Sequence, residues 1–256
     1  MSADRSAGRF AGRVAIVTGA GSGLGEFIAR GLADEGAHVV VADVDGEAAV
    51  RVAGEIGGTH TVTDVTVWDD VVDMVATARA IGPVRALVLS AAVETRAGVV
   101  DSTDEAWQQV LDVNLKGPFL CMKHAVPAMI EAGGGSVVAL GSTLGQITQP
   151  QYAAYCASKF ALTNLCKQVA IEHAKDGIRV NVVAPSATTT GLFMKMTDQA
   201  PDPDAIRAMV ASNMPMRRLA EPSEVVAAAL YLLSDDASYT SGAVLPVDGG
   251  LAARRT

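Results

Sequence analysis

Short apolar runs rich in β-branched residues recur along this chain, and stretches of helical character separate them. This alternation is typical of βα units, because strands that run parallel in one sheet need a crossover connection, usually a helix, between them. The predicted strands lie near Val14–Thr18, His38–Asp43, Thr59–Val62, Ala86–Ser90, Ser136–Leu140, Arg179–Ala184 and Ala243–Val247. We therefore expect an α/β fold in which residues 1–256 form a single doubly wound domain, a seven-stranded parallel sheet with helices on both faces.

Two helix starts and one irregular segment are also visible. Ser102 with Glu105 predicts a capping box, and Pro222 suits the first turn of a helix. The segment Thr188–Arg218 shows no strand pattern and carries five methionines together with a Pro-Asp-Pro sequence. A long insertion after a strand is typical of a substrate lid, although methionines also fill cores and subunit interfaces.

Charge and composition exclude several classes of function. The net charge is −8 and the isoelectric point is near 5.0, so the chain is poorly suited to bind nucleic acid. The first apolar run is too short for a signal peptide or a membrane span, which predicts a soluble, cytoplasmic protein with no membrane partner. We expect no metal site, because the cysteines and histidines match no common zinc spacing: Cys121, Cys156, Cys166, His38, His60, His124 and His173.

A glycine-rich loop follows the first predicted strand and leads into a helical stretch, Thr18–Gly25. Glycine lets the backbone approach a pyrophosphate, and the helix N-terminus behind it offers free N–H groups. Turns also need glycine, but strand, loop and helix occur here in the order that a dinucleotide site requires. The spacing, Gly-x-x-x-Gly-x-Gly, differs from the standard Gly-x-Gly-x-x-Gly. The loop residues expected to bind the cofactor are Gly19, Ser22, Gly23, Leu24 and Gly25.

Asp43 ends the second predicted strand, 18 residues after Gly25. A carboxylate there can accept hydrogen bonds from the adenosine ribose and would repel the 2′-phosphate of NADP. No arginine stands at Ala42, Val44 or Ser22 to attract that phosphate. NAD is therefore the expected cofactor.

Tyr155 and Lys159 are four residues apart in a helical stretch from about Ala153 to His173, so they share one face. The attraction between an ammonium and an ionised phenol about 4 Å away is roughly 4 kcal/mol at an effective dielectric of 20. This attraction would lower the pKa of the phenol by about three units, and desolvation would oppose part of that change. This predicts a general acid/base titrating closer to neutral pH. Ser142, just past the fifth strand, is expected to hold the substrate oxygen beside the phenol.

With these motifs the chain resembles the short-chain dehydrogenase/reductase family, whose fold is Rossmann-like, from about Phe10 to Gly250. The resemblance implies an active-site tetrad of Asn114, Ser142, Tyr155 and Lys159, in which Asn114 holds a water of a proton relay. It implies that Tyr155 and Lys159 also contact the cofactor, Lys159 at the nicotinamide ribose. The C-terminal segment, including residues 247–250, resembles the C-terminal signature of the family, and this resemblance implies a homotetramer.

The same resemblance implies the remaining cofactor contacts. Asp64, followed by Val65, matches the adenine pocket, and Thr188 and Thr190 match positions that hold the carboxamide. The chain departs from the family at two places: Leu89-Ser90-Ala91-Ala92 replaces Asn-Asn-Ala-Gly, and Pro185-Ser186 replaces Pro-Gly. Both lie where cofactor contacts are expected, at Ser90, Ala91, Ala92 and Pro185.

The expected reaction is hydride transfer between NAD and a secondary alcohol or ketone. The methionine-containing segment favours an apolar or cyclic substrate, whereas four polar residues favour a polyol or sugar: Glu94, Gln146, Gln149 and Gln151. Two alternatives remain. An NADPH-dependent biosynthetic reductase is disfavoured by Asp43, and a non-catalytic NAD(H)-sensing protein is disfavoured by the intact tetrad.

Overall fold

The computed structural model describes residues 8–254 and contains one seven-stranded parallel sheet in the order β3-β2-β1-β4-β5-β6-β7. The strands are β1 (Val14–Thr18), β2 (His38–Asp43), β3 (Thr59–Val62), β4 (Val84–Leu89), β5 (Gly135–Leu140), β6 (Ile178–Pro185) and β7 (Val244–Val247). The expected Rossmann-like α/β fold is confirmed, and the strand bounds differ from the predicted ones by at most two residues.

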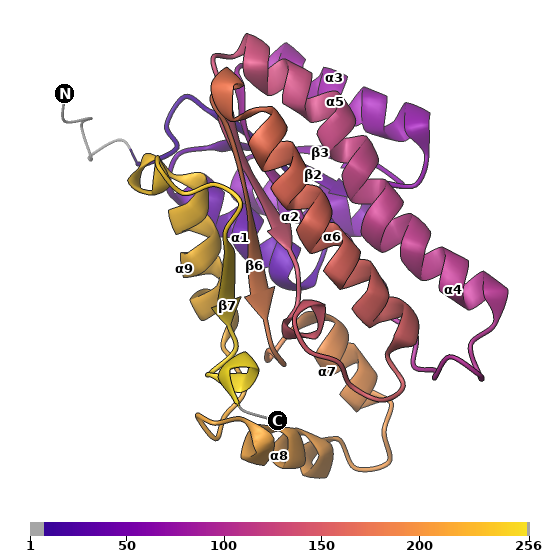
Figure 1. Ribbon diagram of the computed structural model, residues 1–256. Coiled ribbons are helices and arrows are strands. Elements are labelled where there is room, and N and C mark those ends of the chain that lie inside the picture. The colour runs from indigo at the N-terminus through magenta and orange to yellow at the C-terminus, as the bar shows by residue number, and fades with distance from the viewer. Residues whose placement is uncertain (1–7, 255–256) are drawn as a thin grey trace.

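Helices cover both faces of the sheet (Figure 1). On one face lie α1 (Gly23–Asp34), α2 (Gly46–Ile56) and α9 (Pro222–Leu233). On the other lie α3 (Trp68–Ile81), α5 (Gly117–Glu131) and α6 (Ala153–Glu172), with α4 (Asp104–Leu111) next to α6. Strands buried on both faces need apolar residues at every position, which is why β1 reads as the continuous run Val14–Val17 followed by a buried threonine.

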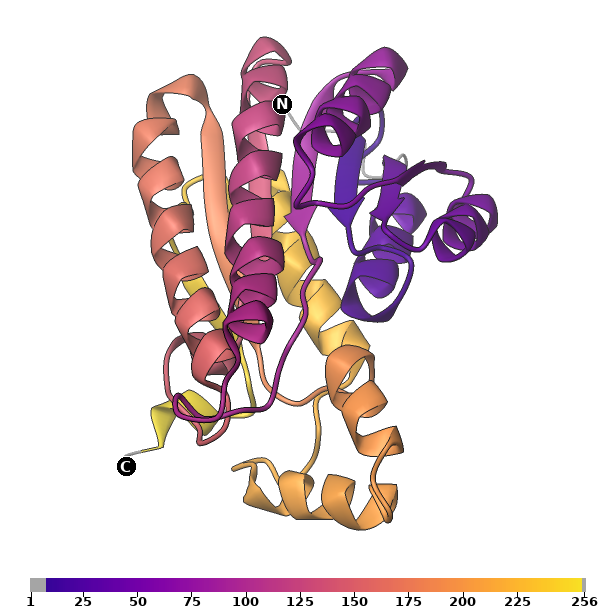
Figure 2. The same cartoon turned by 90° about the vertical axis from the view of Figure 1, so that its right-hand side faces the viewer.

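The segment Thr188–Arg218 folds largely into two short helices, α7 (Gly191–Asp198) and α8 (Pro203–Asn213). Asp202 caps α8 by accepting a hydrogen bond from the Ala205 N–H at 2.9 Å, and Pro203 occupies its first position. Figures 1 and 2 show this helix pair set off beyond the carboxyl ends of the strands.

The expected capping box at Ser102 is wrong. Helix α4 begins at Asp104, and the Thr103 hydroxyl accepts the capping hydrogen bond from the Ala106 N–H at 3.2 Å. The Ser102 hydroxyl instead donates to the Gly98 carbonyl at 2.8 Å. Both residues are good N-caps, so the tertiary path of the preceding loop decides between them. Pro222 does occupy the first position of α9, as expected.

Among residues 8–254, no helix combines the length and the apolar character that a bilayer crossing requires.

Candidate active site

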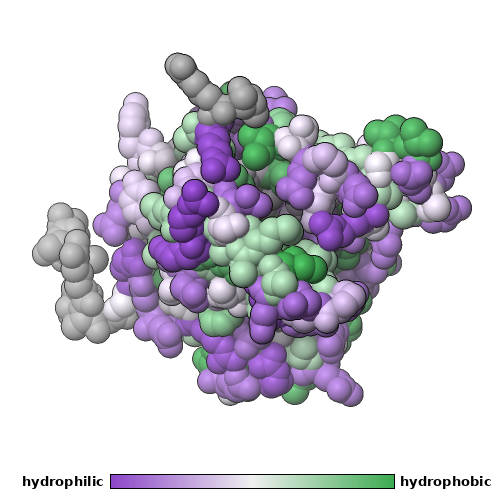
Figure 3. Space-filling model, turned by 90° about the horizontal axis from the view of Figure 1, so that it is seen from below, coloured by the Kyte–Doolittle hydropathy of each residue, from purple (hydrophilic) through white to green (hydrophobic). Residues whose placement is uncertain are grey.

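A cavity of about 770 Å³ opens at the carboxyl ends of the strands, where open α/β sheets bind their ligands. Its walls come from the β1–α1 loop, the ends of β2, β4, β5 and β6, the start of α6, and the helices α7 and α8. Figure 3 views the molecule from this end, where apolar side chains lie among hydrophilic ones. The volume falls within the range of small-molecule and cofactor sites.

The glycine loop forms one end of the cavity. Gly19 has a φ of +63°, and a Cβ on it would lie 2.7 Å from the Ala91 backbone. A Cβ on Gly25 would lie 2.1 Å from the Gly19 carbonyl oxygen, so Gly25 lets α1 pack directly beneath the loop. Gly19, Ser22, Gly23 and Leu24 line the cavity, whereas Gly25 lies behind it. Neither Gly19 nor Gly25 can carry a side chain in this geometry, so the backbone N–H groups stay open to a ligand.

Two carboxylates stand beside the loop. The Asp43 carboxylate accepts hydrogen bonds from the Gly21 N–H at 2.8 Å and from the Asp45 N–H at 3.0 Å. The Asp64 carboxylate accepts from the Thr66 N–H and hydroxyl at 2.9 and 2.7 Å. Asp43, Asp64 and Val65 all line the cavity. Asp43 is therefore anchored to the glycine loop at the cavity wall.

Tyr155 lies at the other end of the cavity, 9% exposed, with Leu144 and Leu192 packed against its cluster. Burial raises the pKa of Tyr155, the nearby Glu94 carboxylate raises it further, and a hydrogen bond with Ser142 lowers it. The Ser142 hydroxyl also accepts a hydrogen bond from the Leu144 N–H at 3.1 Å. Ser142 and Tyr155 thus meet at the cavity wall, as the sequence suggested.

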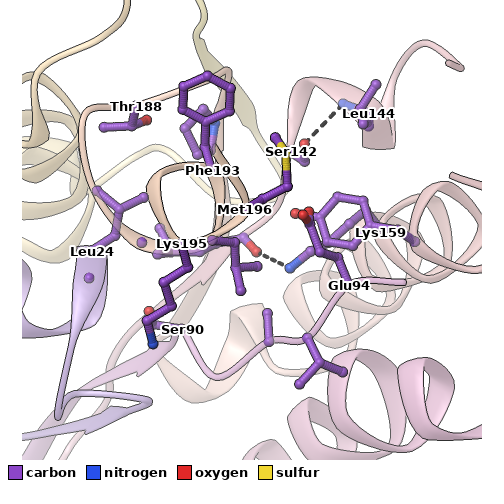
Figure 4. Close-up of a pocket in the computed structure, with 18 of the residues that line it drawn as sticks. Leu24, Ser90, Glu94, Ser142, Leu144, Lys159, Thr188, Phe193, Lys195 and Met196 are labelled. Atoms are coloured by element: carbon purple, nitrogen blue, oxygen red, sulfur yellow. Dashed lines mark hydrogen bonds between the residues drawn. The ribbon is translucent and has the colours of Figure 1, made fainter. Parts of the chain in front are cut away.

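Lys159 reaches the same wall from one helical turn further on (Figure 4). Its ammonium donates to the Leu140 carbonyl at 2.8 Å and lies 5.6 Å from the centre of the Tyr155 ring. Burial lowers the pKa of Lys159 to about 8. The expectation that Lys159 brings the Tyr155 pKa towards neutrality is wrong for this arrangement, because burial opposes the charged form of both groups.

Asn114 lies on a single π-helical turn, Asp112–Lys116, and is fully buried. Its side chain accepts from the Val93 N–H at 2.9 Å and donates to the Val93 carbonyl at 2.8 Å and to the Ser158 hydroxyl at 3.2 Å. Asn114 does not line the cavity. Its side chain ties the segment after β4 to α6, the helix that carries Tyr155.

Comparison with known proteins identifies the family. A family model described as enoyl-(acyl carrier protein) reductase matches residues 19–252. A cis-4-hydroxycyclohexanecarboxylate dehydrogenase of Sinomonas cyclohexanicum is 41% identical over 95% of this chain and 98% of its own length. The chain belongs to the short-chain dehydrogenase/reductase family.

Other members of the short-chain dehydrogenase/reductase family agree with this assignment. A galactitol 2-dehydrogenase (L-tagatose-forming) of Cereibacter sphaeroides is 39% identical over 96% of this chain and 97% of its own. The crystal structure of levodione reductase superposes with a TM-score of 0.93 at 29% identity, covering 96% of this chain and all of the other. The chain is therefore an oxidoreductase, and dehydrogenases of this family use nicotinamide cofactors.

The hydroxyls of two threonines hold the backbone beside the two departures from the family pattern. Thr18 accepts from the Ser90 and Ala91 N–H groups at 3.2 and 3.4 Å, which braces the end of β4 against β1. The Thr143 hydroxyl donates to the Pro185 carbonyl at 3.2 Å. The residues at these departures that are expected to contact the cofactor line the cavity: Ser90, Ala91, Ala92 and Pro185. Thr188 and Thr190, which follow Pro185 in the chain, line it as well.

Several residues that line the cavity are not identified by any sequence motif. Tyr152 packs edge-on against Tyr155 with 6.2 Å between ring centres, and the Arg96 guanidinium lies 5.1 Å from the centre of the Tyr152 ring. Tyr152 is the N-cap of α6, so no helical spacing indicates it, and only its position three residues before Tyr155 could have done so. Leu251 reaches the cavity from beyond β7, and no local pattern indicates it. Of the five methionines of 188–218, those that line the cavity are Met196, Met209 and Met214.

Among residues 8–254, no group of three or more histidine, cysteine, aspartate or glutamate side chains is arranged to hold a metal ion.

Proposed function

We propose that this protein is an NAD-dependent oxidoreductase that interconverts a secondary alcohol and a ketone, with Tyr155 as the acid/base. The observation that carries the proposal is the pairing, in one cavity, of a glycine cradle at one end with Ser142, Tyr155 and Lys159 at the other. A dinucleotide needs the first, and proton transfer to an alcohol oxygen needs the second.

The residues present fit a nicotinamide dinucleotide. The loop Gly19–Leu24 would hold the pyrophosphate, Asp43 the adenosine ribose, and Asp64 and Val65 the adenine. Residues 90–92, Pro185, Thr188 and Thr190 would surround the nicotinamide half, with Lys159 at its ribose. When bound, the nicotinamide accepts or supplies the hydride. The negative charge of Asp43 supports NAD over NADP.

The protein residues handle the proton. Ser142 would donate a hydrogen bond to the substrate oxygen, and Tyr155 would take the hydroxyl proton in alcohol oxidation or give it in ketone reduction. Asn114 fixes the backbone beside this site and is proposed to position the water of the relay through Lys159. Because burial raises the pKa of Tyr155, its phenol is the protonated acid at neutral pH, and alcohol oxidation should become faster as pH rises.

The cavity lining supports two substrate classes. Leu144, Leu192 and Phe193 with the three lining methionines provide an apolar surface, whereas Glu94, Arg96 and Gln149 are polar. The relatives named above include enzymes for a hydroxylated ring acid and for a polyol. We propose a cyclic or polyhydroxylated secondary alcohol as the substrate, admitted beneath a lid formed by Thr188–Arg218.

We further propose a homotetrameric, single-domain, cytoplasmic protein. The neighbouring helices α4, α5 and α6 expose Trp107, Phe119 and Phe160 at 37%, 46% and 39%, large apolar side chains that an assembly would cover. All three cysteines are free, which fits a reducing compartment. Light scattering on the purified protein tests the assembly, and a monomer would contradict it.

The test of the function is NAD reduction across aliphatic, cyclic, aromatic, steroidal and sugar alcohols, with Tyr155→Phe as the matched variant. We expect turnover on one class of alcohol, loss of that turnover in Tyr155→Phe, and fluorescence titrations that show NADH still bound by both proteins. Tight NADH binding without turnover on any class would favour the sensing alternative. A lower KM for NADP than for NAD would refute the cofactor assignment.

A further inference from the structure

The first residue of α7 touches the glycine loop. A Cβ on Gly23 would lie 3.1 Å from the Gly191 Cα, and both glycines have positive φ angles, +60° and +65°. A side chain at Gly23 would crowd the Gly191 backbone, whereas a Cβ on Gly191 would lie 3.9 Å from the Gly23 Cα, an ordinary contact. The proposed lid is therefore docked on the very loop that is expected to hold the cofactor phosphates.

Lys195 lies one turn into α7 and extends into the cavity towards the side on which Leu24 and Ser90 lie (Figure 4). Its Nζ is 3.5 Å from the Ser22 Oγ. Ser22 is the N-cap of α1, and its side chain makes no capping bond, so the first N–H groups of α1 remain available. An ammonium and a helix N-terminus thus lie beside each other at the phosphate end of the cavity, and both favour an anion.

The charge of Lys195 is not neutralised by a protein carboxylate. No ion pair among residues 8–254 includes it. The other cation near the loop, Arg51, donates to the Gly21 carbonyl at 2.9 Å and is paired with Glu26 at 3.1 Å. Of these two cations, Lys195 is the one whose charge is free to meet an anionic ligand.

We propose that Lys195 binds the pyrophosphate of the nicotinamide cofactor and thereby couples cofactor binding to closure of α7. This rests on the proposed function, because it assigns a further contact in the same site. We assign Lys195 to the pyrophosphate and not to the 2′-phosphate of NADP, because Asp43 would place a negative charge beside that 2′-phosphate.

The same helix forms a wall of the substrate end. Leu192 packs with the cluster of Tyr155 and Tyr152, and Met196 contacts the Arg96 guanidinium at 3.4 Å through its sulfur. Fixing Lys195 on the cofactor would therefore fix the apolar surface that receives the alcohol. Cofactor binding should then precede productive substrate binding.

The experiment compares Lys195→Met with Lys175→Met, a change at an exposed lysine outside the cavity. Binding of ADP-ribose, 2′-phospho-ADP-ribose and adenosine is measured by calorimetry. We expect Lys195→Met to weaken ADP-ribose binding about fivefold to tenfold and to leave adenosine binding unchanged. Lys195→Arg should recover most of the loss, and Lys175→Met should match the wild type.

Hydrogen exchange gives the second readout. ADP-ribose should slow amide exchange over residues 191–198 in the wild type and in Lys175→Met, but much less in Lys195→Met. Equal ADP-ribose affinity in all variants, with NADH still bound, overturns the inference and leaves the proposed function standing. An effect confined to 2′-phospho-ADP-ribose also overturns it. A wild-type protein that binds neither NADH nor ADP-ribose refutes the proposed function itself.

Discussion

Replacing Lys159 by methionine should remove catalytic activity and at the same time make the fold more stable. Burial lowers the pKa of Lys159 from 10.5 to about 8. A tenfold change in an acid dissociation constant is worth about 1.4 kcal/mol, so the buried ammonium destabilises the folded state by about 3 kcal/mol at pH 7. Methionine has similar length and carries no charge. Losing the hydrogen bond to the Leu140 carbonyl offsets about 1 kcal/mol, which leaves a net gain of about 2 kcal/mol.

The pH dependence of this gain follows from the direction of the pKa change. A lysine whose pKa is lower in the folded state binds fewer protons there than in the unfolded state, so wild-type stability rises between about pH 8 and 10.5. At pH 9.5 the remaining destabilisation is about 1 kcal/mol, so the stability advantage of the variant should nearly vanish. Taking the difference between the two proteins cancels the titration of other groups.

Urea unfolding at fixed protein concentration, followed by circular dichroism at pH 7 and pH 9.5, measures both effects. Lys175→Met serves as the control and should stay within about 0.5 kcal/mol of the wild type at each pH. A Lys159→Met protein that is less stable than the wild type at pH 7 would refute the reasoning. A stability difference that does not change with pH would refute it as well.

Three further changes test the cavity. Gly19→Ala places a methyl group 2.7 Å from backbone atoms at a φ of +63°. The variant should therefore bind NADH at least about tenfold more weakly, measured by fluorescence titration, and lose about 1–3 kcal/mol of stability, measured by urea unfolding. Asp43→Asn keeps an acceptor but removes the charge, and the NADP/NAD ratio of kcat/KM should rise about tenfold; an unchanged ratio would remove Asp43 from cofactor selection. Glu94→Gln removes a charge that raises the pKa of Tyr155, so the acid limb of the pH profile for alcohol oxidation should move to lower pH. A move to higher pH would contradict the assignment of this limb to Tyr155.

Local patterns in the sequence suffice to predict the sheet and the positions of the main motifs. Apolar runs of β-branched residues mark strands buried on both faces, and the order of strand, glycine loop and helix follows from local rules of backbone geometry. The spacing of four residues, about one helical turn, predicts that Tyr155 and Lys159 share one face. The position of Asp43 at the end of a strand predicts that it lies at the edge of the sheet where ligands bind.

The electrostatics and the long-range contacts depend on the three-dimensional packing of the chain. The pKa of Lys159 depends on how completely α6 and β5 exclude water, and spacing along the chain carries no information about burial. The bonds of Asn114 to Val93 and Ser158 join segments far apart in sequence. The approach of Gly191 to Gly23, which sets Lys195 beside the cofactor loop, likewise exists only once α7 packs on α1, because such contacts arise from the packing of the whole domain.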